Sequence, residues 1–260
     1  MIEIRGVSKE FAKGGRRVLA LQEIDLTVAE REFVAILGPS GCGKSTLLNM
    51  VAGFELATQG LVKAAGAEIV APAPSRGVVF QEPALFPWLT VMDNVLFGPR
   101  VLGQSALEFR ARAARIIEQI GLSGFEASYP AELSGGMRQR VGIARVLIME
   151  PKLLLMDEPF GALDAQTRAL MQELLLGLWE RHHQTVLFVT HDIEEAILLA
   201  DRVCVMTARP GRIKKSIDVR IPRPRSIELT TSPEFNALRR EVLELIREES
   251  LRAAMERIGA

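Results

Sequence analysis

Cysteine, long apolar runs and net charge are all scarce in this sequence. Of its 260 residues only Cys42 and Cys204 are cysteines, and their positions match no spacing typical of a disulfide framework or a metal site. We therefore expect both to be free thiols in a reducing compartment. No apolar run approaches the roughly 18 residues of a membrane-spanning helix, and residues 1–5 lack the apolar core of a signal peptide. The chain is predicted to be cytosolic, or to be held at a membrane by other proteins.

Net charge is absent because 32 basic residues balance 32 acidic ones. The chain therefore has no overall field to attract nucleic acid, and we expect no nucleic-acid partner. Apolar residues, by contrast, are plentiful and make up 48% of the sequence. They suffice to bury one large core, or a core with a smaller appended lobe.

Two patterns of apolar residues predict strands. Residues 2–7 and 19–28 carry apolar side chains at alternate positions, which is typical of half-buried antiparallel strands. Short continuous apolar runs later in the chain are typical of buried parallel strands separated by helices. These runs lie at residues 33–37, 77–80, 153–156, 185–190 and 203–206. The sequence therefore predicts an α/β core preceded by an antiparallel β region.

Helical periodicity marks two further regions. Between residues 83 and 150 an apolar stripe predicts an inserted helical lobe, and beyond residue 210 a last strand and an amphipathic tail helix are predicted. The lobe stripe is Phe109, Ala113, Ile116, Ile117 and Ile120; the strand alternates at Ile217, Val219 and Ile221; the tail stripe is Phe235, Leu238, Val242, Leu245 and Ile246. We predict a domain at 1–225, with a helical subdomain inserted at about 84–150, and a helical tail at 226–260.

Residues 38–46 fit the phosphate-loop pattern GxxxxGK[ST] and directly follow the strand predicted at 33–37. Glycines let the backbone aim its N–H groups at phosphate, and the helix that follows adds its positive end. Lys44 is expected to reach the terminal phosphates, and the Ser45 hydroxyl to bind Mg²⁺. Because this context disfavours a chance glycine-rich turn, we predict a nucleoside triphosphate ligand. Its expected contacts are Gly38, Pro39, Ser40, Gly41, Cys42, Gly43, Lys44, Ser45 and Thr46.

Asp157 and Glu158 end another predicted strand. Beside a phosphate loop, Asp157 can bind Mg²⁺ directly or through water, and Glu158 can deprotonate the water that attacks the terminal phosphate. The alternative is a pair of acids that merely starts a helix before Pro159. His191 follows a further predicted strand and is a candidate phosphate sensor, although a lone histidine is more often structural.

Residues 133–140 read Leu-Ser-Gly-Gly-Met-Arg-Gln-Arg and contain the pattern LSGGxxQ. Ser134 offers a hydroxyl, and Gly135 and Gly136 let N–H groups at a helix start approach a phosphate closely. An ordinary Ser-Gly-Gly helix start is the alternative interpretation. Together with the phosphate loop and the Asp-Glu pair, this segment resembles the ATP-binding subunits of ABC transporters, and the resemblance covers nearly the whole chain.

The resemblance implies further site residues and a fold. Gln81 matches the Q-loop as a catalytic residue and magnesium ligand, Asp164 the D-loop, His191 the H-loop, and Phe11 the aromatic that stacks on adenine. Gln139 of the signature segment completes the expected ATP and Mg²⁺ site. The catalytic residues so implied are Lys44, Gln81, Glu158 and His191. The implied fold is a P-loop NTPase core of ABC ATPase type with an N-terminal antiparallel β subdomain and an inserted helical subdomain.

The resemblance also implies an assembly and a task. Two copies would bind ATP head to tail, with Ser134 and Gly136 of one copy facing the phosphate held by Lys44 of the other. The pair would hydrolyse ATP at the cytoplasmic face of the inner membrane, bound to transmembrane permease subunits. An external solute-binding protein would deliver the solute to those subunits. Segments 209–213 and 221–225 resemble importers of nitrate, sulfonate and taurine, which indicates uptake of a small anion. The alternatives are a soluble ABC ATPase not coupled to transport, and a subunit that holds ATP without hydrolysing it.

Some positions depart from the family pattern or allow two interpretations. Gly161 stands where many relatives carry serine, and Gly142 lies inside a predicted helix, where alanine would be favoured by about 1 kcal/mol. If the helix start lowers the pKa of Cys42, alkylation should inactivate the enzyme and ATP should protect it. Trp88 is either an exposed anchor for a membrane subunit or a core or turn residue. The basic residues of the C-terminal region could touch lipid headgroups or a partner, but charged strand edges are usually solvated, so we assign them no site role. They are Arg209, Arg212, Lys214, Lys215, Arg220, Arg223 and Arg225.

Overall fold

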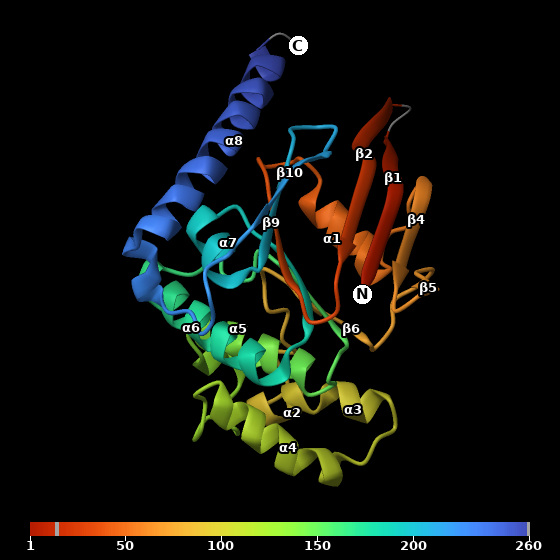
Figure 1. Cartoon of the computed structure of the whole chain (residues 1–260). Coiled ribbons are helices and arrows are strands. Elements are labelled where there is room, and N and C mark those ends of the chain that lie inside the picture. Colours follow the sequence, from red (N-terminus) through yellow and green to blue (C-terminus); the bar gives the residue numbers. More distant parts are fainter. Residues whose placement is uncertain (14–15, 259–260) are drawn as a thin grey trace. The chain divides into compact units, whose positions relative to one another are not determined.

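A computed structural model describes residues 1–13 and 16–258 of the chain. Two compact units make up the structure (Figure 1). The first unit combines Met1–Ala73 with the residues from His183 onward, and the second unit is Pro74–His182. The phosphate loop therefore belongs to the first unit, whereas the Asp-Glu pair and the signature segment belong to the second.

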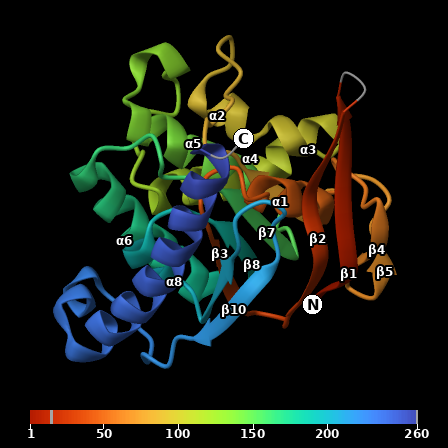
Figure 2. The ribbon, with the colours of Figure 1, turned by 90° about the horizontal axis from the view of Figure 1, so that it is seen from above.

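An antiparallel sheet with strand order β2-β1-β4-β5 forms one part of the first unit (Figures 1 and 2). Its strands are β1 (Ile2–Lys13), β2 (Arg16–Val28), β4 (Gln59–Ala64) and β5 (Ala67–Glu68). β1 and β2 pair from Ile2 opposite Val28 to Phe11 opposite Val18 and beyond, which confirms the predicted N-terminal antiparallel strands. β4 and β5 carry too few buried apolar residues to be predicted from the sequence.

A second group of strands in the first unit has the order β10-β9-β3-β8. These strands are β3 (Phe33–Leu37), β8 (Thr185–Val189), β9 (Arg202–Met206) and β10 (Ile213–Asp218). β3 runs parallel to both β8 and β9, and all of its residues are buried. The rings of Phe33 and Phe188 meet at 5.7 Å in this core. The apolar runs at 33–37, 185–190 and 203–206 are thus confirmed as buried parallel strands.

The last strand is shorter than the sequence predicts. β10 ends at Asp218 and pairs antiparallel with β9, so Val219 and Ile221 lie beyond it. Their carbonyl oxygens accept hydrogen bonds from the Arg225 side chain instead of from a neighbouring strand. The predicted last strand is therefore confirmed as β10, but it ends before Val219 and Ile221, which are buried beside the Arg225 side chain.

The described residues of the first unit also form the helical segments α1 (Lys44–Ala52), α7 (Ile193–Leu199), the 3₁₀ turn η2 (Ile227–Thr231) and α8 (Pro233–Ile258). α8 is the predicted tail helix; it buries Phe235 and Val242 and packs against α7, η2 and β9. Residues 259–260 of the predicted tail lie outside the described residues. Among the described residues, no helix combines the length and the apolar content that crossing a bilayer requires.

The second unit contains the parallel pair β6 (Arg76–Val79) and β7 (Leu153–Asp157) together with its own helices. These are α2 (Val91–Val95), α3 (Phe97–Val101), α4 (Ala106–Gln119), the 3₁₀ turn η1 (Pro130–Glu132), α5 (Gly135–Leu147) and α6 (Ala165–His182). The stripe predicted for the helical lobe lies on α4 and the residue after it, where Ala113, Ile116, Ile117 and Ile120 are buried. That helix is confirmed.

Candidate nucleotide-binding site

The phosphate loop joins β3 to α1 in the first unit. Gly43 caps the start of α1 with a φ of 104°, a left-handed conformation that glycine adopts without strain. A Cβ on Gly43 would come within 2.6 Å of Leu21 Cδ2, and one on Gly38 within 2.8 Å of Cys42 Sγ. The loop is therefore folded so tightly that only glycine fits at these points, as a backbone cradle for phosphate requires.

Lys44 is buried at the first position of α1. Its Nζ donates hydrogen bonds to the carbonyl oxygens of Gly38 at 2.9 Å and Pro39 at 3.4 Å. The ammonium group therefore lies within the turn of the loop, next to the positive end of α1. This concentration of positive charge suits a polyphosphate ligand.

Cys42 lies inside the same loop and corrects our expectation of a reactive thiol. Its side chain is 1% exposed, and burial raises the pKa of the thiol, although Lys44 and Arg209 act in the opposite direction. Desolvation of the thiolate thus outweighs the charges at the helix start. Cys204 is buried as well, and both cysteines are free thiols, as predicted.

We expect Cys42 to resist alkylation in the folded protein. Because its pKa is raised and its sulfur is buried, iodoacetamide near neutral pH should label it about tenfold more slowly than after unfolding in guanidinium chloride. Peptide mass spectrometry measures the labelling, and Cys204, also buried with a raised pKa, is the internal comparison. Fast labelling of Cys42 alone, prevented by ATP, would contradict this expectation.

The other predicted residues of the first unit lie at strand ends or on strands. His191 is exposed between β8 and α7, where the Asp192 side chain caps α7 by accepting a hydrogen bond from Glu195 N at 3.1 Å. Phe11 is half-buried on β1, and Lys9 Nζ lies 4.8 Å from the centre of its ring. One face of Phe11 thus already contacts a cation.

In the second unit, Asp157 is the last residue of β7, and Glu158 follows it with a φ of 44°. A left-handed φ is uncommon outside glycine and often marks a functional turn. A Cβ on Gly161 would lie 3.2 Å from Gln81 Nε2 and 3.7 Å from Glu158 Oε2. The predicted catalytic residues Gln81 and Glu158 therefore both lie close to Gly161, where a larger side chain would crowd them.

The signature segment starts helix α5. The Ser134 side chain caps the helix by accepting a hydrogen bond from Met137 N at 3.3 Å, and Gly135 is exposed. A Cβ on Gly136 would lie 2.4 Å from Thr167 Cγ2 on α6, so a larger residue there would displace the Thr167 side chain. The exposed Ser134 and Gly135 leave the positive end of α5 open to a ligand.

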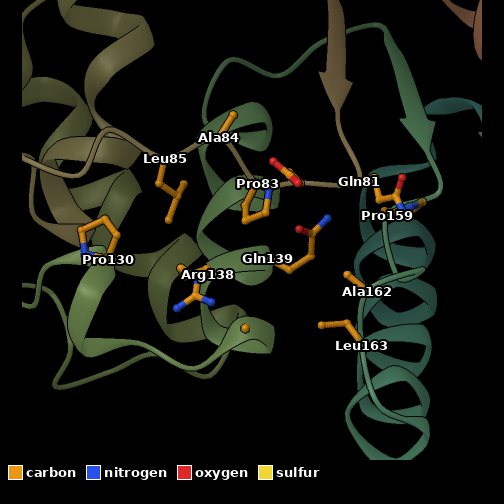
Figure 3. Close-up of a pocket in the computed structure, with 12 residues that line it drawn as sticks. Gln81, Pro83, Ala84, Leu85, Pro130, Arg138, Gln139, Pro159, Ala162 and Leu163 are labelled. Carbon is orange, nitrogen blue, oxygen red and sulfur yellow. The ribbon is translucent and has the colours of Figure 1, made fainter.

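A cleft of about 410 Å³ lies beside the start of α5 (Figure 3). Gln139 reaches from α5 to the edge of this cleft, is otherwise buried, and donates a hydrogen bond to Phe80 O at 3.1 Å. Phe80 directly precedes Gln81, which also lines this cleft (Figure 3). Gln139 therefore connects the signature helix to the Q-loop within this unit.

Asp164, the predicted D-loop carboxylate, lies just before α6. It accepts hydrogen bonds from Thr167 N at 3.0 Å and from Thr167 Oγ1 at 2.7 Å. These bonds lower the pKa of Asp164. Asp164 and the signature residue Gly136 thus contact the same threonine, so the D-loop and the signature helix are joined through Thr167.

Sequence reasoning missed the roles of several residues. Gly142 is close-packed, because a Cβ there would lie 3.2 Å from Pro83 Cβ, so helix propensity alone misjudged it. Trp88 is 70% exposed, which excludes the core interpretation. Arg225, expected to be solvated, is buried, and Arg209 donates to Gly41 O in the phosphate loop. The only sequence signal for these arginines was their place next to prolines in two short motifs.

Magnesium has suitable ligands among the predicted residues. The Ser45 hydroxyl, the Gln81 amide oxygen and the Asp157 carboxylate are hard oxygen donors, which Mg²⁺ prefers. Ser45 and Gln81 are exposed, and Asp157 is half-buried. The donor set therefore fits this ion.

These features define a class of protein, the phosphate-loop ATPases that carry a serine-glycine signature helix. Residues 21–161, more than half of the chain, match the family described as ABC transporter. An uncharacterized ABC transporter ATP-binding protein of Methanocaldococcus jannaschii is 47% identical over 97% of this chain and 93% of its own length. The chain therefore belongs to the ABC transporter family of ATP-binding proteins and is an ATPase of that type.

Named importers are among its relatives. An aliphatic sulfonates import ATP-binding protein of Bacillus cereus is 46% identical over 94% of each chain. A taurine import ATP-binding protein of Jannaschia sp. is 44% identical over 94% of this chain and 93% of its own. The predicted resemblance to this importer group is thus confirmed.

A solved structure resembles the chain as well. It is a dimeric ATP-binding cassette in a post-hydrolysis state with ADP and phosphate, with a TM-score of 0.74 and 33% identity over 85% of this chain and all of its own. The predicted fold class, a P-loop NTPase core of ABC ATPase type, is confirmed.

Proposed function

We propose that this chain is the ATP-hydrolysing subunit of an importer that takes up a small anion such as a sulfonate, taurine or nitrate. The observation that carries the proposal is the pair of relatives named for sulfonate and taurine import, each similar along almost the whole chain. Specificity for the solute would lie in the permease subunits and an external binding protein. The chain itself would work at the cytoplasmic face of the inner membrane.

The predicted site residues would divide the chemistry among them. Loop N–H groups and Lys44 bind the phosphates, and Phe11 stacks on adenine. Ser45, Gln81 and Asp157 would hold Mg²⁺, which when bound neutralises charge on the terminal phosphates. The carboxylate of Glu158 takes a proton from the attacking water.

His191 would complete the constellation at the terminal phosphate. It follows β8 and is exposed, so its ring is accessible to a ligand. An imidazole N–H can donate a hydrogen bond to a phosphate oxygen as negative charge shifts there during hydrolysis. We therefore assign His191 the role of phosphate sensor.

Two copies of the chain would share each ATP. In this arrangement the exposed end of α5, with Ser134 and Gly135, faces the phosphate that Lys44 of the other copy binds, and Asp164 lies near the same junction. The dimeric state of the similar cassette supports this assembly. ATP would hold the pair together, and hydrolysis would let it open.

Domain boundaries follow from the same proposal. We assign residues 1–225 to the ATPase domain, with the helical subdomain inserted at about 84–150, and residues 226–260 to a helical tail. The positions of α2 to α5 and of α8 support this division. The inserted subdomain would carry the surface that meets the permease.

Trp88 is the candidate anchor on that surface. Its loop is held by Asn94, a fully buried residue whose Nδ2 donates hydrogen bonds to the carbonyl oxygens of Leu89 and Thr90, each at 3.0 Å. Asn94 Oδ1 also accepts a hydrogen bond from Phe86 N at 2.9 Å. An exposed aromatic on a loop held by several hydrogen bonds can bind a partner with a smaller loss of conformational entropy.

Replacing Trp88 by Ala should weaken binding to the permease about thirtyfold and leave ATP hydrolysis by the isolated subunit unchanged. Leu107, 82% exposed in the same unit, provides the matched control Leu107→Ala, for which no loss is expected. Affinity can be measured with a detergent-purified permease of the sulfonate or taurine importer class. Equal losses in both variants would show that Trp88 is not the anchor.

The function as a whole is tested by ATP-driven uptake into vesicles that contain the permease and its binding protein. Uptake of labelled taurine, an alkanesulfonate or nitrate should require this chain and fail with Lys44→Ala. If the chain stays away from membranes and hydrolyses ATP at a rate that the permease never changes, it is a soluble ABC ATPase instead.

A further inference from the structure

A tight turn between β9 and β10, which we call the brace turn (residues 207–211), lies against the phosphate loop in the first unit. Thr207 closes it: Thr207 N donates to Arg212 O, and Arg212 N donates to Thr207 Oγ1, both at 2.9 Å. Thr207 Oγ1 also donates to Pro210 O at 3.0 Å. The turn is therefore fixed internally and can transmit a displacement as a unit.

The brace turn contacts the phosphate loop at two residues. The Arg209 guanidinium donates from Nε and Nη2 to the carbonyl oxygen of Gly41, at 3.3 and 3.2 Å. Gly211 packs so closely that a Cβ on it would lie 2.1 Å from the carbonyl oxygen of Cys42. The brace turn thus contacts the backbone of the phosphate loop at the carbonyl oxygens of Gly41 and Cys42.

Gly211 is in turn anchored to β2. Its N donates to Ala20 O, and its O accepts from Gln22 N, both at 2.9 Å. Leu21, between these residues, is the side chain that a Cβ on Gly43 would meet. One end of the brace turn is therefore fixed by backbone hydrogen bonds.

The other end depends on a side chain of the C-terminal helix. Glu249 of α8 is 1% exposed, and its Oε2 accepts a hydrogen bond from Ala208 N at 2.9 Å. Its Oε1 accepts from Lys214 Nζ at 2.7 Å. Burial alone would raise the pKa of Glu249, but these bonds, with Arg252, lower it, so the carboxylate is charged and doubly bonded.

We propose that Glu249 is a positioning residue for nucleotide binding: through Ala208 it fixes the brace turn, and the turn, through Arg209 and Gly211, fixes the phosphate loop. The tail helix would thereby set how well the loop is organised for phosphate. The inference rests on the proposed role of the phosphate loop and adds a control element outside it. Any partner that shifts α8 would change nucleotide affinity by this route.

The chemistry of the carboxylate explains why glutamine cannot replace it. A carboxylate accepts hydrogen bonds at both oxygens, whereas an amide has one acceptor and one donor group. In Glu249→Gln either Ala208 N or the Lys214 ammonium would face an NH₂ group, inside a buried site where an unmet donor is costly. The brace turn should then shift or loosen.

Nucleotide affinity tests the proposal, with Glu248→Gln as the matched control. Glu248 also pairs with Lys214, at 2.5 Å, but is exposed and has no bond to the brace turn. We expect Glu249→Gln to weaken ATP binding and raise KM about five- to tenfold, with kcat little changed, and Glu248→Gln to stay within about twofold of wild type. Both should remain folded by circular dichroism.

A double-mutant cycle separates positioning from a general structural role. Arg209→Ala and Glu249→Gln act on the same turn, so their effects on ATP affinity should be less than additive. A loss of thermal stability in Glu249→Gln with unchanged ATP affinity would overturn the proposal, as would full additivity. If wild type itself binds no ATP, the proposed function fails rather than this inference.

Discussion

Replacing Glu158 by Gln should reduce ATP hydrolysis by about 10²–10⁴-fold, the range typical for removal of a general base. The amide keeps the size of the carboxylate and tolerates the same left-handed backbone, whose φ is 44°. It cannot accept the proton of the attacking water. ATP binding should persist, so the variant should accumulate as an ATP-bound dimer on size-exclusion chromatography with magnesium.

The control for this prediction is Glu173→Gln, an exposed acid on α6, which should hydrolyse ATP at the wild-type rate. The same experiment decides between the enzyme and a subunit that only holds ATP. If wild type and Glu158→Gln turn ATP over equally slowly, Glu158 is not the general base, and the chain binds ATP without hydrolysing it.

Replacing Arg225 by Met should destabilise the folded chain by about 3 kcal/mol. Arg225 is 7% exposed. Its guanidinium donates to the carbonyl oxygens of Ile197, Leu198 and Ala200 at the end of α7, and to those of Val219 and Ile221. Burial, with a smaller effect from Arg223, lowers its pKa to about 10. The hydrogen bonds to the carbonyl groups offset the free-energy cost of burying the guanidinium. Methionine would leave these carbonyl groups without hydrogen-bond donors.

Arg239→Met is the control, because Arg239 forms an exposed ion pair with Glu194 at 3.1 Å. Such pairs contribute roughly 0–1 kcal/mol, so its denaturation midpoint should hardly move. The denaturation midpoint of Arg225→Lys should lie between those of Arg225→Met and wild type, since one ammonium group cannot reach both groups of carbonyl oxygens. Urea denaturation followed by circular dichroism measures all of them. Equal midpoints for Arg225→Met and Arg239→Met would refute the structural role.

The phosphate loop, the acidic strand end and the signature helix could be predicted because their chemistry is local. A glycine-rich loop after an apolar strand predicts a phosphate site without information from distant segments. Apolar runs such as 33–37 likewise predict buried strands. The same locality explains why the helical stripe ending at Ile120 was found.

The parts that sequence reasoning missed depend on contacts between distant segments. Arg225 meets carbonyls that lie well before it in the sequence, and Glu249 meets Ala208, so neither shows a local pattern. Helix propensity disfavours glycine at position 142, whereas close packing against Pro83 favours a residue without a side chain there. The pKa of Cys42 likewise follows from burial, which a motif does not specify.

The proposal that two copies of this chain form each hydrolytic site predicts that ATPase activity depends on protein concentration. Activity per molecule of wild type should rise with concentration and level off as dimers form. Ser134→Arg places a bulky cation at an exposed helix start, so it should still bind ATP but show little hydrolysis at any concentration. Activity that is independent of concentration and survives Ser134→Arg would show a self-contained site and contradict the claim.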